Sequence, residues 1–235
     1  LDQVVLAIRS LEILLNNPNL DPNIRIDGAR DLVIFYSRTP FSTAQIQKIS
    51  SYAPEVKQRE ENLRFFSDEL KRLGKKKESA LVKLHILQAF PKSEETLADK
   101  VDLFEILVHV GKKKEAGQML SLITAADCDE ACNDISTNLQ KILRGWADEE
   151  KTKASPELIQ CFVIYSQYKF AQEKPLLLAI KVSQDHKYHG PALAIIARVL
   201  AMTKDPNVYE SALKAQIVSA EATKLPTNIE KAYKQ

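Results

Sequence analysis

Hydrophobic residues recur every three or four positions along most of the chain. In residues 1–16, for example, this spacing places the apolar side chains Val4, Ile8, Leu11 and Leu15 on one face of a helix. No segment alternates hydrophobic and polar residues between hairpin turns, so we predict no strands. The pattern predicts an all-α fold of roughly twelve or thirteen helices with short connections.

Capping residues and proline indicate where several helices begin. Asp21-Pro22, Ser155-Pro156 and Asp205-Pro206 each combine a short polar cap with a proline that fits the first helical turn. Ser42 to Gln45 has the sequence of a capping box, and a last, weak helix is expected after Pro226. We expect the apolar helix faces to be buried, and they include Val5, Leu14, Ile24, Leu32, Val33, Val56, Leu63, Phe66, Leu73, Leu81, Leu84, Phe104, Leu122, Leu139, Phe162, Tyr209 and Val218.

One short motif occurs twice. Residues 73–78 read Leu-Gly-Lys-Lys-Lys-Glu, residues 110–115 read Val-Gly-Lys-Lys-Lys-Glu, and the two glycines lie 37 residues apart. Each glycine follows one apolar helical face and precedes another, which is typical of a tight turn at a helix end. The repeat therefore predicts two successive helical hairpins.

The second of these hairpins resembles a tetratricopeptide repeat. Its large and small residues and its turn glycine recur at the offsets of that family, at Leu103, Phe104, Leu107, Gly111, Ala116, Leu120 and Ile123. The hairpin around Gly74 is similar except that Ala80 sits one place late. The resemblance covers residues 54–126 best, extends loosely over the last 80 residues, and hardly touches the first 50. It implies an α-solenoid of antiparallel hairpins that binds peptides or proteins in a concave groove.

The polar run 148–153 is the best candidate for an internal boundary. We therefore expect an N-terminal helical array over residues 1–148 and C-terminal hairpins over residues 149–235 that continue it. Each hairpin is apolar on two sides, so it has to bury both against its neighbours.

Composition adds only broad limits. The formal net charge of +2 argues against a polyanion as a global partner. No apolar run reaches the length of about 18 residues that a membrane span needs, so a soluble chain is expected. The odd cysteine count favours a reducing, cytoplasmic compartment. The chain starts with Leu1 rather than Met, from which we expect a cut or processed product, and an exported or periplasmic location stays open.

Two sets of residues are candidates for partner binding. The lysines of the two glycine turns would lie along one edge if the hairpins stack, and could then bind an acidic peptide, an anionic lipid or nucleic acid; they are Lys75, Lys76, Lys77, Lys112, Lys113 and Lys114. The simpler interpretation is that they keep exposed turns hydrated. Nucleic acid is disfavoured because no aromatic residues are interleaved with them. Trp146 is a candidate interface anchor, although core packing is the favoured interpretation.

No pattern of catalytic or cofactor-binding residues is present. The sequence lacks a Gly-x-Ser-x-Gly elbow, a glycine-rich phosphate loop, a His-Glu-x-x-His motif and carboxylate pairs in apolar surroundings. Cys128 and Cys132 lack the further ligands that a zinc site needs, and so do His186 and His189. We therefore expect neither a catalytic residue nor a cofactor nor a bound metal.

Together these patterns favour a non-enzymatic scaffold or adaptor that binds a protein or peptide, alone or within a larger complex. Small-molecule substrates are disfavoured. Two alternatives stay open. One is an enzyme subunit or regulatory domain with an unrecognised site, and the other is an anion-binding surface at the lysine-rich turns.

Overall fold

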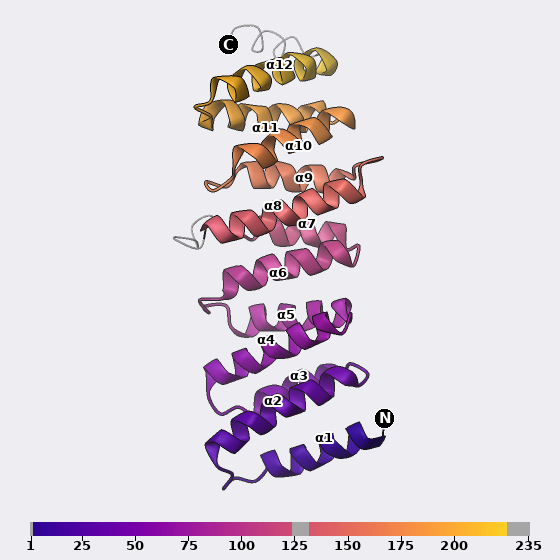
Figure 1. The fold of residues 1–235 in the computed structure, drawn as a ribbon, viewed down its shortest axis with the longest axis vertical. Helices are drawn as coiled ribbons and strands as arrows, with labels where there is room; N and C mark the ends of the chain where they lie inside the picture. Colours follow the sequence, from indigo (N-terminus) through magenta and orange to yellow (C-terminus); the bar gives the residue numbers. More distant parts are fainter. Residues whose placement is uncertain (1, 124–131, 225–235) are drawn as a thin grey trace. The chain divides into compact units, whose positions relative to one another are not determined.

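The structure, a computed structural model, describes residues 2–123 and 132–224 of the 235-residue chain. Over these residues it contains twelve α-helices and no strand (Figure 1). The prediction of an all-α fold is therefore confirmed for the described residues. The weak helix expected after Pro226 lies outside them.

The chain divides into two compact units, Leu1–Val110 and Gly111–Gln235. The described part of the first unit contains six helices, which are α1 (Asp2–Leu15), α2 (Pro22–Arg38), α3 (Thr43–Ser51), α4 (Val56–Arg72), α5 (Lys76–Ala89) and α6 (Thr96–His109).

The described part of the second unit contains six more helices, which are α7 (Lys113–Ser121), α8 (Cys132–Glu149), α9 (Pro156–Ser166), α10 (Glu173–Asp185), α11 (His189–Met202) and α12 (Pro206–Thr223). The polar stretch 148–153, the candidate internal boundary, connects α8 to α9. Along the sequence, the division between the two compact units falls between Val110 and Gly111.

The capping signals in the sequence correspond to observed helix starts. The Asp21 carboxylate accepts a hydrogen bond from the backbone N–H of Asn23, and the Asp205 carboxylate accepts one from that of Asn207, both at 2.8 Å. Ser42 begins α3 with both hydrogen bonds of a capping box. These bonds satisfy backbone donors that have no partner within the helix.

Helices of the first unit pack mainly on their neighbours in sequence. The substantial contacts join α1 to α2, α2 to α3 and α4, α3 to α4, α4 to α5, and α5 to α6. One apolar cluster runs through α1 to α5, and its buried members include Leu15, Leu32, Val33, Ile49, Leu63, Phe66, Leu70, Val82 and Ile86. Short connections explain this order, because they hold each helix antiparallel to the next.

The second unit shows the same preference for near neighbours. Helix α9 contacts α7, α8, α10 and α11, while α12 packs on α11 and more weakly on α10. The largest fully buried side chains of this unit are aromatic, namely Trp146 of α8 and Phe162 and Tyr165 of α9. Aromatic side chains bury a large area each, so α9 lies at the centre of the unit's core.

Several apolar residues that the helical pattern assigned to the core are exposed, and for these the prediction is wrong. Val56, at the start of α4, is the clearest case, with 63% of its surface exposed. A helix contacts its neighbours over a narrower stripe than its apolar face, so residues at the margins of that stripe face water. The same applies to Val5, Leu14, Ile24, Leu73, Leu81, Leu84, Leu122, Tyr209 and Val218.

The two glycine turns have the same local geometry. Gly74 and Gly111 both have φ of +76°, a left-handed conformation that side chains with a Cβ rarely adopt. The next helix begins two residues after each glycine, at Lys76 and Lys113. After α4, the backbone N–H of Lys75 donates to the Leu70 carbonyl at 2.9 Å, and the N–H of Gly74 donates to that of Lys71 at 3.0 Å. This is the Schellman pattern of helix termination.

Replacing either turn glycine with alanine should lower the free energy of unfolding by about 1–2 kcal/mol. No atom lies within 4 Å of a Cβ added at Gly74 or Gly111, so the cost comes from the positive φ alone. Gly145 is the matched control. A Cβ added at Gly145 would also meet no atom within 4 Å. Gly145 lies inside α8, however, where alanine should raise the free energy of unfolding by about 0.5–1 kcal/mol. Urea unfolding followed by circular dichroism would measure all three, and equal effects at the three positions would contradict the conformational explanation.

Candidate binding groove and charged clusters

The lysines of the first glycine turn differ in what they contact. The ammonium group of Lys75 donates to the carbonyl oxygens of Ser37 and Thr39, both at 2.7 Å, at the C-terminal end of α2. A cation is favourable there because the carbonyls at a helix end carry partial negative charge. Lys76 is half-buried, and Lys77 is exposed. Lys75 therefore has a structural contact within the protein.

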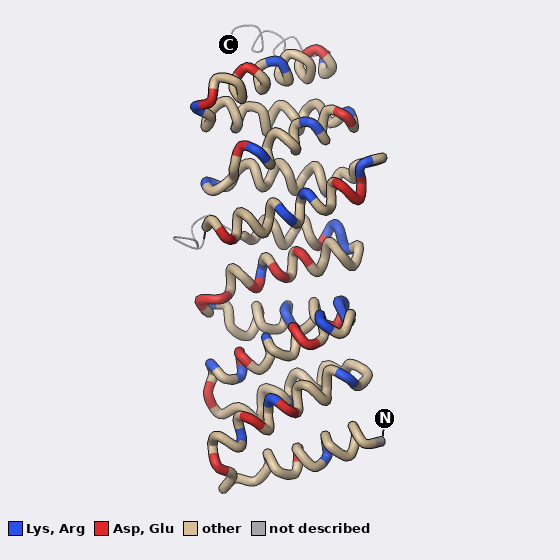
Figure 2. The backbone as a smooth tube through the Cα atoms, viewed as in Figure 1, with Lys and Arg blue, Asp and Glu red and all other residues tan. Residues whose placement is uncertain are grey.

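The lysines of the second turn divide in a similar way. Lys113 forms an ion pair with Glu150, whereas Lys112 and Lys114 are exposed. Figure 2 shows the basic residues of both turns in blue. The first turn belongs to the first compact unit, and the second turn begins the second. A role for these lysines in anion binding stays a prediction.

Trp146 is buried, with 2% of its surface exposed. Its indole N–H donates to Oε1 of Glu150 at 2.8 Å. The other carboxylate oxygen of Glu150 accepts a hydrogen bond from the backbone N–H of Ser155 at 2.6 Å, and Lys113 binds the same carboxylate. This carboxylate thus connects α7, α8 and the start of α9. A partner could reach the tryptophan ring only after displacing the side chains around it.

The hydrogen bonds around Glu150 determine its ionisation. Burial alone would raise the pKa of this carboxyl group. The bonds from Lys113, Ser155 and Trp146 favour the charged form more strongly, and they lower the pKa from 4.5 to about 2. Glu150 is therefore ionised wherever the unit is folded above that pH.

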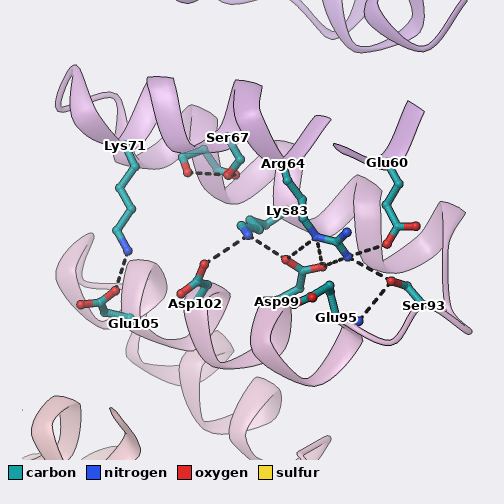
Figure 3. A network of polar contacts seen from close by, with 11 residues as sticks. Glu60, Arg64, Ser67, Lys71, Lys83, Ser93, Glu95, Asp99, Asp102 and Glu105 are labelled. Carbon is teal, nitrogen blue, oxygen red and sulfur yellow. Dashed lines mark hydrogen bonds and ion pairs between the residues drawn. The ribbon is translucent and has the colours of Figure 1, made fainter. Parts of the chain in front are cut away.

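A second polar cluster lies between α4, α5 and α6 of the first unit, and Figure 3 shows its members. The ammonium group of Lys83 binds Asp99 at 2.7 Å and Asp102 at 3.1 Å. On its other side, Asp99 accepts hydrogen bonds from Arg64, the shortest at 2.7 Å. Arg64 also pairs with Glu60 at 2.5 Å. The side chain of Glu60 is only 12% exposed.

The centre of the cluster is almost closed to water, whereas Asp102 at its margin is 43% exposed. The side chain of Lys83 is 4% exposed, and that of Asp99 is 3% exposed. Burial alone would lower the pKa of Lys83, but the carboxylates of Asp99 and Asp102 outweigh this effect and raise it. The arrangement fixes how α4, α5 and α6 sit against one another. Its buried members, Lys83 and Asp99, leave little surface on which a ligand could bind.

Sequence reasoning missed this cluster, although a signal was present. Lys83 falls between Val82 and Ile86 on the face of α5 that packs inward. Asp99 lies likewise among the apolar residues of α6. A charged residue at a core position of a helix is rare unless it is paired, so these two positions could have been singled out as partners.

The candidate metal ligands do not converge. Among residues 2–123 and 132–224, no group of three or more His, Cys, Asp or Glu side chains could hold a metal ion. His186 ends α10 and His189 begins α11, so only two residues separate them. Cys132 is disulfide-bonded at the start of α8, and Cys128 lies outside the described residues.

A candidate binding surface lies in the second unit. It is a partly open hollow of about 510 Å³, in the size range of ligand-binding clefts. We call it the α8–α10 groove. Its lining comes from α8, α9 and α10, and consists of Thr137, Gln140, Lys141, Leu143, Arg144, Asp148, Phe162, Lys174, Pro175 and Leu178.

The α8–α10 groove combines apolar and basic side chains. Leu143 and Phe162 are buried, whereas Pro175 and Leu178 are half-buried and keep part of their surface available. Lys141, Arg144 and Lys174 are exposed around this apolar area, and Asp148 is the single acidic residue of the lining. Such a surface can accept an apolar side chain and a negative charge together.

Similarity to known proteins adds nothing to this picture. Comparisons with protein-family models, with curated proteins and with solved structures give no match. In the part of the chain that the structure describes, no helix combines the length and apolar character needed to cross a bilayer.

Proposed function

We propose that this protein is a non-enzymatic interaction module that holds a segment of a protein or peptide partner in the α8–α10 groove. The observation that carries the proposal is the groove itself. It is lined mainly by α8 and α10, which contact one another, with an apolar area beside exposed charged side chains. Helical arrays commonly present such surfaces to extended or helical peptides.

The proposal includes the architecture. We propose that the helices form an α-solenoid of antiparallel hairpins, similar to tetratricopeptide repeats over residues 54–126. Contacts confined to near neighbours within each unit support this arrangement, and so do two glycine turns of equal φ. In such an array the binding surface is already formed in the free protein. Binding therefore orders few side chains, and the affinity for the partner is higher because this entropy cost is small.

Selection of peptides from a random display library against the full chain tests the proposed site. Enriched peptides should lose at least about tenfold in affinity, or about 1.4 kcal/mol, for Thr137→Trp, which fills the α8–α10 groove with an indole ring. Thr137 is exposed in the lining, so the substitution removes nothing from the core.

Asn138→Trp is the matched control. Asn138 is exposed on the same helix but is not part of the lining, and its replacement should change the affinity by less than about twofold. Peptides that bind Thr137→Trp as tightly as the original chain would place the binding site elsewhere. A selection that enriches no peptide at all would remove the basis of the proposed function.

A further inference from the structure

Positive charge is concentrated around the α8–α10 groove. Lys141 and Arg144 lie on one face of α8, three residues apart, and Lys174 stands in the first turn of α10. Among the ion pairs found in the described residues, none involves these three cations. The lining therefore carries three cations against one carboxylate, in a chain whose formal net charge is only +2.

The placement of Lys174 strengthens this point. The N-terminus of a helix has partial positive charge, so a lysine there adds to a positive potential instead of offsetting it. Gln172, at the N-cap of α10, makes no side-chain capping bond, and Glu173 is the only acidic residue of the first turn. Like charges focused in a hollow attract anions, and they repel one another until an anion binds.

The apolar lining restricts the kind of anion. Leu178 and Pro175 are half-buried beside the buried ring of Phe162, so an apolar side chain entering there would be removed from water. A free inorganic anion makes no use of such a surface. Stacking of nucleic-acid bases needs aromatic faces that are accessible, and Phe162 is only 1% exposed.

We propose that the α8–α10 groove binds an acidic peptide segment, in which Asp or Glu carboxylates pair with Lys141, Arg144 and Lys174 around an apolar side chain that packs on Leu178 and Pro175. This inference rests on the proposed function and specifies the chemistry of its partner. Charge complementarity of this kind raises the association rate and selects against basic segments.

The experiment measures peptide affinity by fluorescence anisotropy with the full chain at low salt. The probes are labelled synthetic peptides of about ten residues, with four glutamates around a central Leu-Phe pair. In one variant probe glutamine replaces the glutamates, and in another serine replaces Leu-Phe. A thymidine oligonucleotide of equal charge is the fourth probe. The peptides enriched from the display library are scored for Asp and Glu content.

The acidic apolar peptide should bind at least about tenfold more tightly than either peptide variant, and its affinity should fall as salt is added. The triple change K141Q/R144Q/K174Q should weaken it at least about tenfold. The matched control K153Q/K169Q/K204Q removes three charges from exposed lysines of the same unit, and should weaken it by less than about threefold.

The possible failures are distinguishable. If the glutamine peptide binds equally well and Thr137→Trp abolishes its binding, the acidic partner is wrong and the proposed function survives. Enriched library peptides without excess Asp and Glu lead to the same conclusion. If the oligonucleotide binds more tightly through the same three cations, the partner class is overturned. If neither the synthetic peptides nor the library yields a ligand, both proposals fall.

Discussion

Replacing Lys83 with alanine should lower the free energy of unfolding of the first unit by about 2–4 kcal/mol. The substitution leaves Asp99, 3% exposed, without the ammonium group that it binds at 2.7 Å. Water cannot easily replace this partner, since the pair lies between α5 and α6. Asp99 keeps Arg64 as one counterion, but the carboxylate oxygen that Lys83 binds loses its closest charged partner inside the protein. The desolvation penalty of that oxygen dominates the expected loss.

Urea unfolding of the full chain, followed by far-ultraviolet circular dichroism, would measure this loss. Lys77→Ala is the matched control, because Lys77 lies on the same helix and is exposed, and it should cost less than about 0.5 kcal/mol. The double change Lys83→Met with Asp99→Leu should cost less than the sum of the two single changes. A loss below about 1 kcal/mol for Lys83→Ala would contradict this account, because it would mean that water or Arg64 compensates the carboxylate of Asp99.

The second large effect is expected at Glu150, where glutamine should lower the free energy of unfolding of the second unit by about 2–4 kcal/mol at neutral pH. The side chain is 10% exposed and binds Lys113, the indole of Trp146 and the backbone N–H of Ser155. Glutamine keeps the shape but loses the charge, so the ammonium group and the two N–H donors lose their strongest acceptor.

The contribution of Glu150 depends on pH in a defined direction. Its pKa is about 2 in the folded state against 4.5 ordinarily, so its stabilisation is complete above about pH 4.5 and disappears as the pH falls towards 2. The original chain should therefore lose more stability than Glu150→Gln over this range. Fluorescence would follow the second unit selectively, because Trp146 is the only tryptophan.

Glu149→Gln provides the control for this measurement. Glu149 is the adjacent residue, and it is exposed. Its replacement should leave the stability within about 0.5 kcal/mol and the pH profile unchanged. Parallel acid profiles for the original chain and Glu150→Gln would show that the carboxyl group titrates as in the unfolded chain.

The helices could be predicted from sequence because their signals are local. Asp21, Ser42, Ser155 and Asp205 each cap the helix that follows through their own side chains. The glycine turns were predictable for the same reason, since a positive φ depends on the residue itself. Helical periodicity then located most of the remaining elements.

The charged clusters and the groove depend on residues far apart in the chain. Arg64 and Asp99 are 35 residues apart, and Lys113 and Glu150 are 37 apart. Nothing local shows which carboxylate faces which cation. The prediction of which apolar side chains are buried failed for a similar reason. Whether Val56 or Leu84 faces water depends on where the neighbouring helices end. The α8–α10 groove gathers side chains from three helices and has no counterpart in a linear motif.

The ion cluster around Asp99 also limits how this sequence can change over generations. Arg64, Lys83 and Asp99 come from three successive helices, and each relies on a charge supplied by another. A neutral residue at any one of these positions would be tolerated only after, or together with, a compensating substitution at a second. These three positions should therefore covary among related sequences, whereas the exposed residues around them should vary independently.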